Sequence, residues 1–141
     1  METSSRTKIT IETTVNAPIE KVWELWSNPN HVTQWNSASD DWHTPAATND
    51  LKVDGRFSFT MAAKDGSASF DFGGVYTKLE TNKLIEYTLD DERKVSIQFS
   101  GDEQVEITET FEAEGINSIE MQRSGWQAIL DNFKKYAETN K

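Results

Sequence analysis

Hydrophobic and polar residues alternate in the first regular segment of the chain. Charged or polar residues occupy one face of this segment, and the other face carries Ile9, Ile11, Thr13 and Val15. A period of two is typical of a strand with one buried face. We therefore predict that a strand over residues 8–15 opens the fold.

The period changes after Ala17–Pro18, where proline is well suited to the first position of a helix. The next apolar residues recur at helical spacing and predict a short amphipathic helix with the stripe Ile19, Val22, Trp23 and Trp26. The Asn28–Pro29 step ends this helix and begins another, which Asn28 is able to cap. The apolar stripe of the second helix consists of Val32 and Trp35.

Residues 36–49 show neither period and are rich in Ser, Asp, Thr and Pro, so we predict that they form the longest loop. Long loops carry function more often than structure. Trp35 and Trp42 flank this segment, and an indole beside an irregular loop is a common rim for a small-molecule site. Ligand contact and core packing are both open for these two tryptophans.

Alternating apolar residues then recur through the middle of the chain. The predicted strands contain residues 57–61, 68–76, 85–89, 95–99 and 105–111. Gly73–Gly74 predicts a bulge or bend inside the second of them. Short polar turns between the strands indicate an antiparallel meander.

A long helix is predicted at the C-terminal end. Asn117, followed three residues later by Glu120, resembles a capping box. The helix then presents one apolar stripe made of Met121, Trp126, Ile129, Leu130, Phe133 and Tyr136. Gly125 lies within it and costs about 1 kcal/mol relative to alanine, a loss that the close approach of a neighbouring backbone or ring would justify.

This order of elements predicts an α+β fold in which a curved antiparallel sheet wraps around the last helix and the two short helices close one end. A curved sheet meets a single helix along only part of its concave face. The remaining volume is either filled by large side chains or left as a pocket, and the pattern leaves both outcomes open.

Composition narrows the class of protein. The 141 residues amount to one domain, residues 1–141, and the formal charge of -10 disfavours nucleic acid as a partner. No apolar run approaches the roughly 20 residues of a membrane span, and the polar N-terminus makes the cytoplasm the expected location. There is no Cys for disulfides or thiol catalysis. The pattern of His and acidic residues predicts no metal site, and glycine-rich phosphate motifs are missing, so no cofactor is expected.

Two groups of residues are candidates for chemistry. The run Asp40–Asp41–Trp42–His43 places carboxylates next to an imidazole whose basicity they would tune, although the pattern favours a plain solvated loop. Glu109 shares a face with Val105, Ile107 and Phe111, which directs it towards the concave side unless the register shifts. A buried carboxylate needs a partner, for which Arg56, Arg123 or a polar ligand are the candidates.

Several short motifs also carry a resemblance to a known group of proteins. They are Ala17–Pro18, Val22–Trp23, Trp26, Asn28–Pro29, Trp35, Val53–Asp54–Gly55–Arg56–Phe57, Gly74–Val75–Tyr76 and Gly125–Trp126 with Leu130. In this order they are similar to the START-like, or SRPBCC, superfamily, and most of all to its bacterial homologues of the heat-shock chaperone ATPase activator. The resemblance runs from about Ile9 to Tyr136. It implies a helix-grip fold and a cavity more securely than an activity.

Three functions follow as hypotheses. The first is the binding of a small hydrophobic or amphipathic molecule by a pocket lined by Trp35, Trp42, Phe57, Phe59, Tyr87, Phe99, Trp126 and Leu130, in which Glu109 or His43 orients a polar end. The second is a protein-binding role on a chaperone, as the resemblance implies. The third is an enzyme of cyclase or hydrolase type with His43 or Glu109 inside the pocket. A monomer or weak dimer is expected.

Overall fold

The computed structural model describes residues 7–37, 40–115 and 117–139. In chain order, the elements are β1 (Lys8–Val15), α1 (Ile19–Ser27), α2 (Pro29–Trp35), β2 (Trp42–Asn49), β3 (Arg56–Ala63), β4 (Ser69–Glu80), β5 (Leu84–Leu89), β6 (Lys94–Ser100), β7 (Val105–Glu112) and α3 (Ile119–Thr139).

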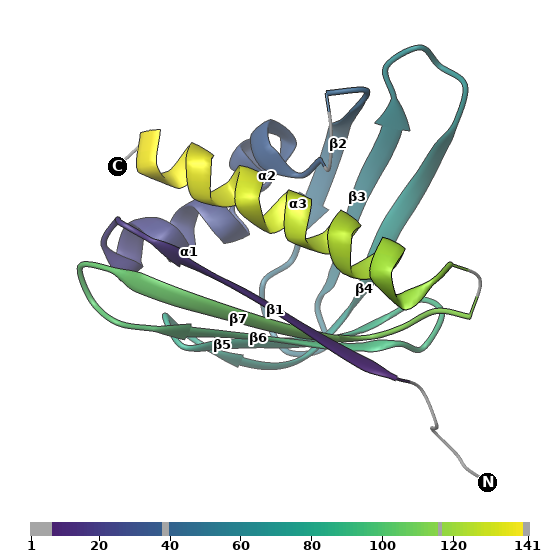
Figure 1. Cartoon of the computed structure of the whole chain (residues 1–141). Helices are drawn as coiled ribbons and strands as arrows, with labels where there is room; N and C mark the ends of the chain where they lie inside the picture. The colour runs from purple at the N-terminus through teal and green to yellow at the C-terminus, as the bar shows by residue number, and fades with distance from the viewer. Residues whose placement is uncertain (1–6, 38–39, 116, 140–141) are drawn as a thin grey trace, which may run out of the picture.

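The strands form one antiparallel sheet in the order β1-β7-β6-β5-β4-β3-β2. β1 therefore pairs with the last strand, and β2 forms the opposite edge. The sheet curls, α3 runs across its concave side, and α1 and α2 lie near the C-terminal end of α3 (Figure 1). The predicted α+β helix-grip fold is confirmed.

Strand periodicity and the stripe of α3 supply the core. Ile9, Ile11 and Val15 of β1 are buried at alternate positions. On α3, Leu130, Phe133 and Ala137 are buried, which is the spacing of one helix face. The hydrophobic effect of covering both surfaces holds helix and sheet together.

Aromatic rings fill the end of the concave face that α1 and α2 close. The ring of Phe133 lies 4.8 Å from Trp26 and 4.8 Å from Trp35, measured between ring centroids. Trp35 also donates a hydrogen bond from Nε1 to the carbonyl oxygen of Leu25, so its polar atom is satisfied. These rings close this end of the concave face, and Trp26 and Trp35 also line the pocket described below.

The prediction of a loop over residues 36–49 is wrong for its second part, because Trp42–Asn49 is strand β2. The strand pairs with β3, but its register shifts between His43 and Ala46, around Pro45. Proline cannot donate to a ladder and is tolerated on an edge strand or at a bulge. The irregular register hides the period of two from the sequence.

The predicted bulge at Gly73–Gly74 is also wrong in position. Both glycines pair in register with β3, and the shift in β4 falls between Tyr76 and Lys78. Gly74 has another reason to be glycine: a Cβ there would lie 2.4 Å from the carbonyl oxygen of Thr88 on the neighbouring strand. A close approach of two backbones therefore explains this glycine, and a bend at the pair stays a prediction.

The start of α3 differs from the predicted capping box. The Oγ of Ser118, not Asn117, accepts the backbone N–H of Met121 at 3.1 Å. Asn117 is occupied elsewhere, because its backbone N–H and its side-chain amide donate to the two carboxylate oxygens of Glu114, each at 2.7 Å. Within the described residues, no helix is both long and apolar enough to cross a membrane.

Candidate functional site

A pocket of about 530 Å³ lies between α3 and the concave face of the sheet. This volume falls in the range of roughly 300–1,000 Å³ that is usual for small-molecule sites. Most of its wall is aromatic or aliphatic. The lining residues are Trp26, Trp35, Asn36, Phe57, Phe59, Met61, Phe70, Phe72, Tyr76, Ile85, Tyr87, Arg93, Glu109, Glu114, Asn117, Met121, Gln122, Gly125, Trp126, Ile129 and Leu130.

The position of Trp126 helps to keep the pocket open. Its indole stacks on Phe111 of β7, with ring centroids 3.8 Å apart and an interplanar angle of 7°. The largest side chain in this half of α3 therefore lies flat against β7, and its other ring contact is edge-on with Phe72 of β4, at 5.8 Å between ring centroids. It anchors helix to sheet, while Phe133 makes the second aromatic attachment near α1 and α2.

Gly125 also helps to keep the pocket open. A Cβ added to Gly125 would meet no heavy atom within 4 Å, and the residue lines the pocket. The expected close approach of a backbone or ring at this glycine is therefore wrong. The missing side chain leaves space in the pocket at the cost of about 1 kcal/mol of helix propensity.

The floor of the pocket is a cluster of rings centred on Phe57 of β3. Its ring centroid lies 5.2 Å from Phe59, 5.3 Å from Tyr76 and 4.7 Å from Tyr87. Alternate residues of adjacent strands share one face of a sheet, and so β3, β4 and β5 direct these rings to the concave side. The floor suits an apolar or aromatic ligand.

Two exposed apolar side chains belong to the same lining. Phe70 on β4 is 51% exposed, and Met121 in the first turn of α3 is 62% exposed. The ring of Trp42 lies 6.0 Å from that of Phe70, so this rim extends towards β2. Large apolar side chains that both line a pocket and meet solvent mark its opening.

The other notable region is a polar end at which Glu109 lies. Glu109 is only 6% exposed, and its register partners on the flanking strands are Ile11 and Ile97. Within residues 7–37, 40–115 and 117–139, no group donates a hydrogen bond to its carboxyl. Because burial disfavours the charged form, the pKa of Glu109 rises to about 8. Glu109 is therefore mainly a neutral acid at pH 7.

Neither arginine proposed from the sequence pairs with Glu109. Arg56 forms a two-point ion pair with Asp90, at 2.8 and 2.6 Å, on the exposed surface. Arg123 is exposed on α3. The sequence suggested Arg56, Arg123 or a polar ligand as the partner of the Glu109 carboxyl, and only the polar ligand is compatible with this geometry.

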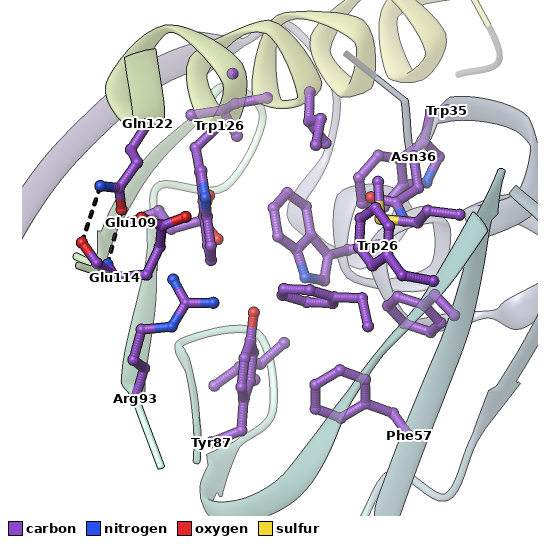
Figure 2. A pocket seen from close by; sticks show the side chains of 18 of the residues that line it. Trp26, Trp35, Asn36, Phe57, Tyr87, Arg93, Glu109, Glu114, Gln122 and Trp126 are labelled. Carbon is purple, nitrogen blue, oxygen red and sulfur yellow. Dashed lines mark hydrogen bonds between the residues drawn. The ribbon is translucent and has the colours of Figure 1, made fainter. Parts of the chain in front are cut away.

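Tyr87 and Arg93 lie at the same end of the pocket. Figure 2 shows the Tyr87 hydroxyl and the Arg93 guanidinium directed towards the space below Trp126, with Glu109 beside it. Tyr87 is 8% exposed, and burial raises the pKa of its hydroxyl well above the ordinary value. Arg93 donates from Nε to Asp91 at 2.7 Å and from Nη1 to the carbonyl oxygen of Glu112 at 3.5 Å.

A hydrogen-bonded connection between β7 and α3 supports this end. The backbone N–H of Glu114 donates to Oε1 of Gln122 at 2.9 Å, and Nε2 of Gln122 donates to the carbonyl oxygens of Glu114 and Asn117. The side chain of Gln122 thus fixes the chain that enters α3 (Figure 2).

No group of acidic, His or Cys side chains able to hold a metal gathers in the described part of the chain.

The structure brings seven of the ten residues predicted for the site to the pocket, and three lie outside it. The seven are Trp35, Phe57, Phe59, Tyr87, Glu109, Trp126 and Leu130. Whether these residues contact a ligand stays a prediction.

The other three have different surroundings. Phe99 packs between Trp23 and Trp26, with ring centroids 5.4 and 5.7 Å away, at the end of the core that α1 and α2 close. His43 is exposed on β2, and Trp42, its neighbour on the strand, contacts Phe70 at the rim. The expected pairing of His43 with the acidic residues before it has no counterpart in the described pocket lining.

Sequence reasoning missed several lining residues. Phe72 shares its strand period with Phe70, so the alternation could have placed it on the concave face. Trp26, which the sequence places on the apolar stripe of the first short helix, contributes to both core and pocket. Arg93 lies in the acidic turn between β5 and β6, and nothing in the sequence indicates that its side chain bends back under α3.

The sheet that grips one long helix and the aromatic pocket between them define a protein of the helix-grip class. Comparison with family models gives a match to "Activator of Hsp90 ATPase homolog 1-like protein" over residues 16–138. The chain therefore belongs to this family, as the resemblance of its motifs predicted.

Solved structures of similar proteins agree with this family assignment. An AHSA1-like protein from Aeromonas hydrophila is 45% identical, with a TM-score of 0.89 over 95% of this chain and 94% of its own. The protein Chr148 from Cytophaga hutchinsonii is 57% identical, with a TM-score of 0.81 over 94% of this chain and 93% of its own. NE0264 from Nitrosomonas europaea, at 12% identity and a TM-score of 0.80 over 98% of both chains, shares the fold alone. The comparison with curated proteins gave no match.

Proposed function

We propose that this protein binds a small, largely apolar molecule in the pocket between α3 and the sheet. The observation that carries the proposal is an aromatic cavity of about 530 Å³ that contains two buried polar groups, on Glu109 and Tyr87, without protein partners among the described residues. A pocket that is mostly apolar and holds a few convergent polar groups is the usual form of a small-molecule site.

Burial energetics support the same proposal. Glu109 and Tyr87 have little access to water, being 6% and 8% exposed, and a polar group that loses its water and gains no partner costs up to about 1–3 kcal/mol, so a stable core rarely retains one without a use. Gly125 points in the same direction, because alanine at that position would improve the helix and yet would take space from the cavity. Both features cost stability and favour an occupant.

A second candidate is binding to a chaperone, for which the family match is the specific support. The exposed rim residues Phe70 and Met121 would then contact the partner protein. A third candidate, a cyclase or hydrolase, has Glu109 inside the pocket as an acid–base group. Among the described lining residues, however, there is no His, Ser, Thr, Cys or Lys to act beside it. We rank ligand binding first.

The test is a screen of the full chain against a panel of lipophilic molecules by native mass spectrometry and tryptophan fluorescence. Trp26, Trp35 and Trp126 line the pocket, so an occupant changes their emission. We expect retained ligand with a 1:1 mass and a spectral shift. Absence of any bound species, together with stimulation of a chaperone ATPase, would favour the second candidate instead.

A cavity-filling variant makes the screen specific to this pocket. Gly125→Leu directs a side chain into the open space and improves helix propensity, so it should fold and lose the ligand. Ser124→Leu is the matched control, because it places the same side chain on the exposed surface of the same helix. Equal binding by both variants would mean that the ligand lies elsewhere.

A further inference from the structure

One end of the pocket carries three side chains with hydrogen-bonding capacity that the described protein does not use. The Tyr87 hydroxyl and the Glu109 carboxyl have no hydrogen-bond partner among the described residues, and both side chains are more than nine-tenths buried. Arg93 uses Nε and Nη1, while its Nη2 makes no hydrogen bond within the same residues. Figure 2 shows all three around the space below Trp126.

The three side chains come from separate elements, so their grouping at one end of the pocket does not result from closeness in the sequence. Tyr87 is on β5, Arg93 is in the turn that follows it, and Glu109 is on β7. In the sheet order, β6 separates β5 from β7, so the curl of the sheet brings them to one end of the same cavity. The rest of the floor is apolar, with Phe57, Phe59 and Ile85.

The hydrogen-bond donors of Arg93, Tyr87 and Glu109 determine which ligand head group fits this end of the pocket. A guanidinium only donates, and a phenol with a raised pKa keeps its proton and donates as well. Glu109 is protonated over most molecules at neutral pH, so it also offers one O–H. Three donors that converge on one place require an acceptor with several lone pairs. A carboxyl group has two oxygens and about four such sites.

Other head groups satisfy the site less well. An ammonium has no acceptor and would face the positive charge of Arg93. A single hydroxyl has one oxygen for three donors. We propose that the ligand of this pocket is an apolar molecule that ends in a carboxyl group, with its chain along the Phe57 floor and its head group against Tyr87, Glu109 and Arg93. This inference rests on the proposed function and specifies its ligand class.

The surrounding charges are compatible with this assignment. The titratable or charged groups of the described lining are Tyr76, Tyr87, Arg93, Glu109 and Glu114, and α1, α2 and α3 contribute none. The two carboxylate oxygens of Glu114 accept hydrogen bonds from Asn117, and the Tyr76 hydroxyl donates to Asn49. Arg93, whose Nε pairs with Asp91 at 2.7 Å outside the described lining, is the one positively charged side chain of that lining and faces a carboxylate ligand.

The experiment compares three probes with the same chain on the full-length protein: decanoate, decanol and decylamine. Isothermal titration at about pH 6.5, below the pKa of Glu109, should rank decanoate first by about tenfold or more, the effect of charge-assisted hydrogen bonds. Equal affinities, or tightest binding of decylamine, would overturn the carboxyl assignment and leave the proposed function standing. Binding of none of the probes would overturn both.

Variants assign the effect to the named groups. Tyr87→Phe should reduce decanoate affinity by about tenfold and decanol affinity less, because it removes one donor and keeps the ring. Tyr136→Phe is the matched control, since its hydroxyl bonds His31 outside the described pocket lining. A Tyr87→Phe protein that retains the full preference for decanoate would contradict the assignment.

The pH profile gives an independent readout. Decanoate affinity should fall between about pH 6.5 and 9, as Glu109 loses its proton and turns from donor into a like charge. Glu109→Gln keeps a neutral donor, so it should bind decanoate near neutral pH and lose this fall. A wild-type profile that is flat over the same interval, or an unchanged fall in Glu109→Gln, would count against the role of Glu109.

Discussion

The indole of Trp126 lies flat on the ring of Phe111, with centroids 3.8 Å apart and planes inclined by 7°. This contact joins the N-terminal half of α3 to β7 next to the pocket. The helix makes aromatic contacts both here and at Phe133, and the pocket lies along its N-terminal half, from Met121 to Leu130. The arrangement links the stability of the fold to the presence of the cavity.

Removing this attachment should destabilise the protein strongly. Trp126→Ala is expected to lower the free energy of unfolding by about 3 kcal/mol, because it deletes a stacked aromatic contact and leaves a void. Urea denaturation followed by circular dichroism measures the change. Met121→Ala is the control on the same helix, where a side chain that is 62% exposed should matter by about 0.5 kcal/mol or less. Similar losses for both variants would contradict the anchoring role.

Gly125→Ala should stabilise the protein. The added methyl group meets no atom within 4 Å, and alanine is favoured over glycine inside a helix by about 1 kcal/mol. We expect a rise of that size in the free energy of unfolding, measured in urea. A fall would mean that the position is tightly packed after all, as the sequence alone suggested.

The N-cap of α3 provides a third prediction. Ser118→Ala should lower stability by about 1 kcal/mol, since it leaves the backbone N–H of Met121 without its side-chain acceptor. Ser124→Ala, on the exposed surface of the same helix, should change stability little. Thermal melts of both variants distinguish the cap from general effects of replacing serine, and equal melting temperatures would argue against Ser118 as the cap.

Glu109 should make stability fall with rising pH. Its pKa is about 8 in the folded protein against an ordinary value of 4.5, so between these values the folded state holds a proton that the unfolded state releases. Stability from this group is complete below about pH 4.5 and is lost progressively as pH rises through about 8. Urea midpoints between pH 5 and 9 should therefore fall by an amount that Glu109→Gln reduces.

A matched control separates this effect from general charge repulsion. Glu106→Gln removes the same charge from the exposed face of β7, where the side chain reaches solvent. Its pH profile of stability should parallel that of the wild type. If Glu109→Gln and Glu106→Gln gave the same profile, burial of the Glu109 carboxyl would not be the cause.

Much of the fold could be predicted because its signals are local and periodic. The alternation of Ile9 and Ile11 and the stripe of Leu130 and Phe133 each indicate a buried face, and Pro18 and Pro29 mark the starts of α1 and α2. Strand β2 was not predicted, because Pro45 and a register shift interrupt its alternation of apolar and polar residues. An edge strand of this kind is defined by its neighbour β3, and a single sequence does not display that pairing.

The site was predicted less completely for a related reason. Glu109 could be placed on the concave face because a strand without a bulge fixes direction by parity. Arg93 could not, since the path of a side chain from a turn depends on the tertiary structure around it. Trp42 and His43 were predicted as site residues because they were placed in or beside a long loop. In the structure both residues belong to strand β2, so this reason for choosing them does not apply.

The most direct test of ligand binding in this pocket is a crystal structure of the full chain grown with decanoate. We predict electron density for one chain of carbon atoms between α3 and the Phe57 floor, with the carboxyl group within hydrogen-bond distance of the Tyr87 hydroxyl. A structure in which the lining side chains have closed the space, or in which decanoate lies only on the outer surface, would contradict the account.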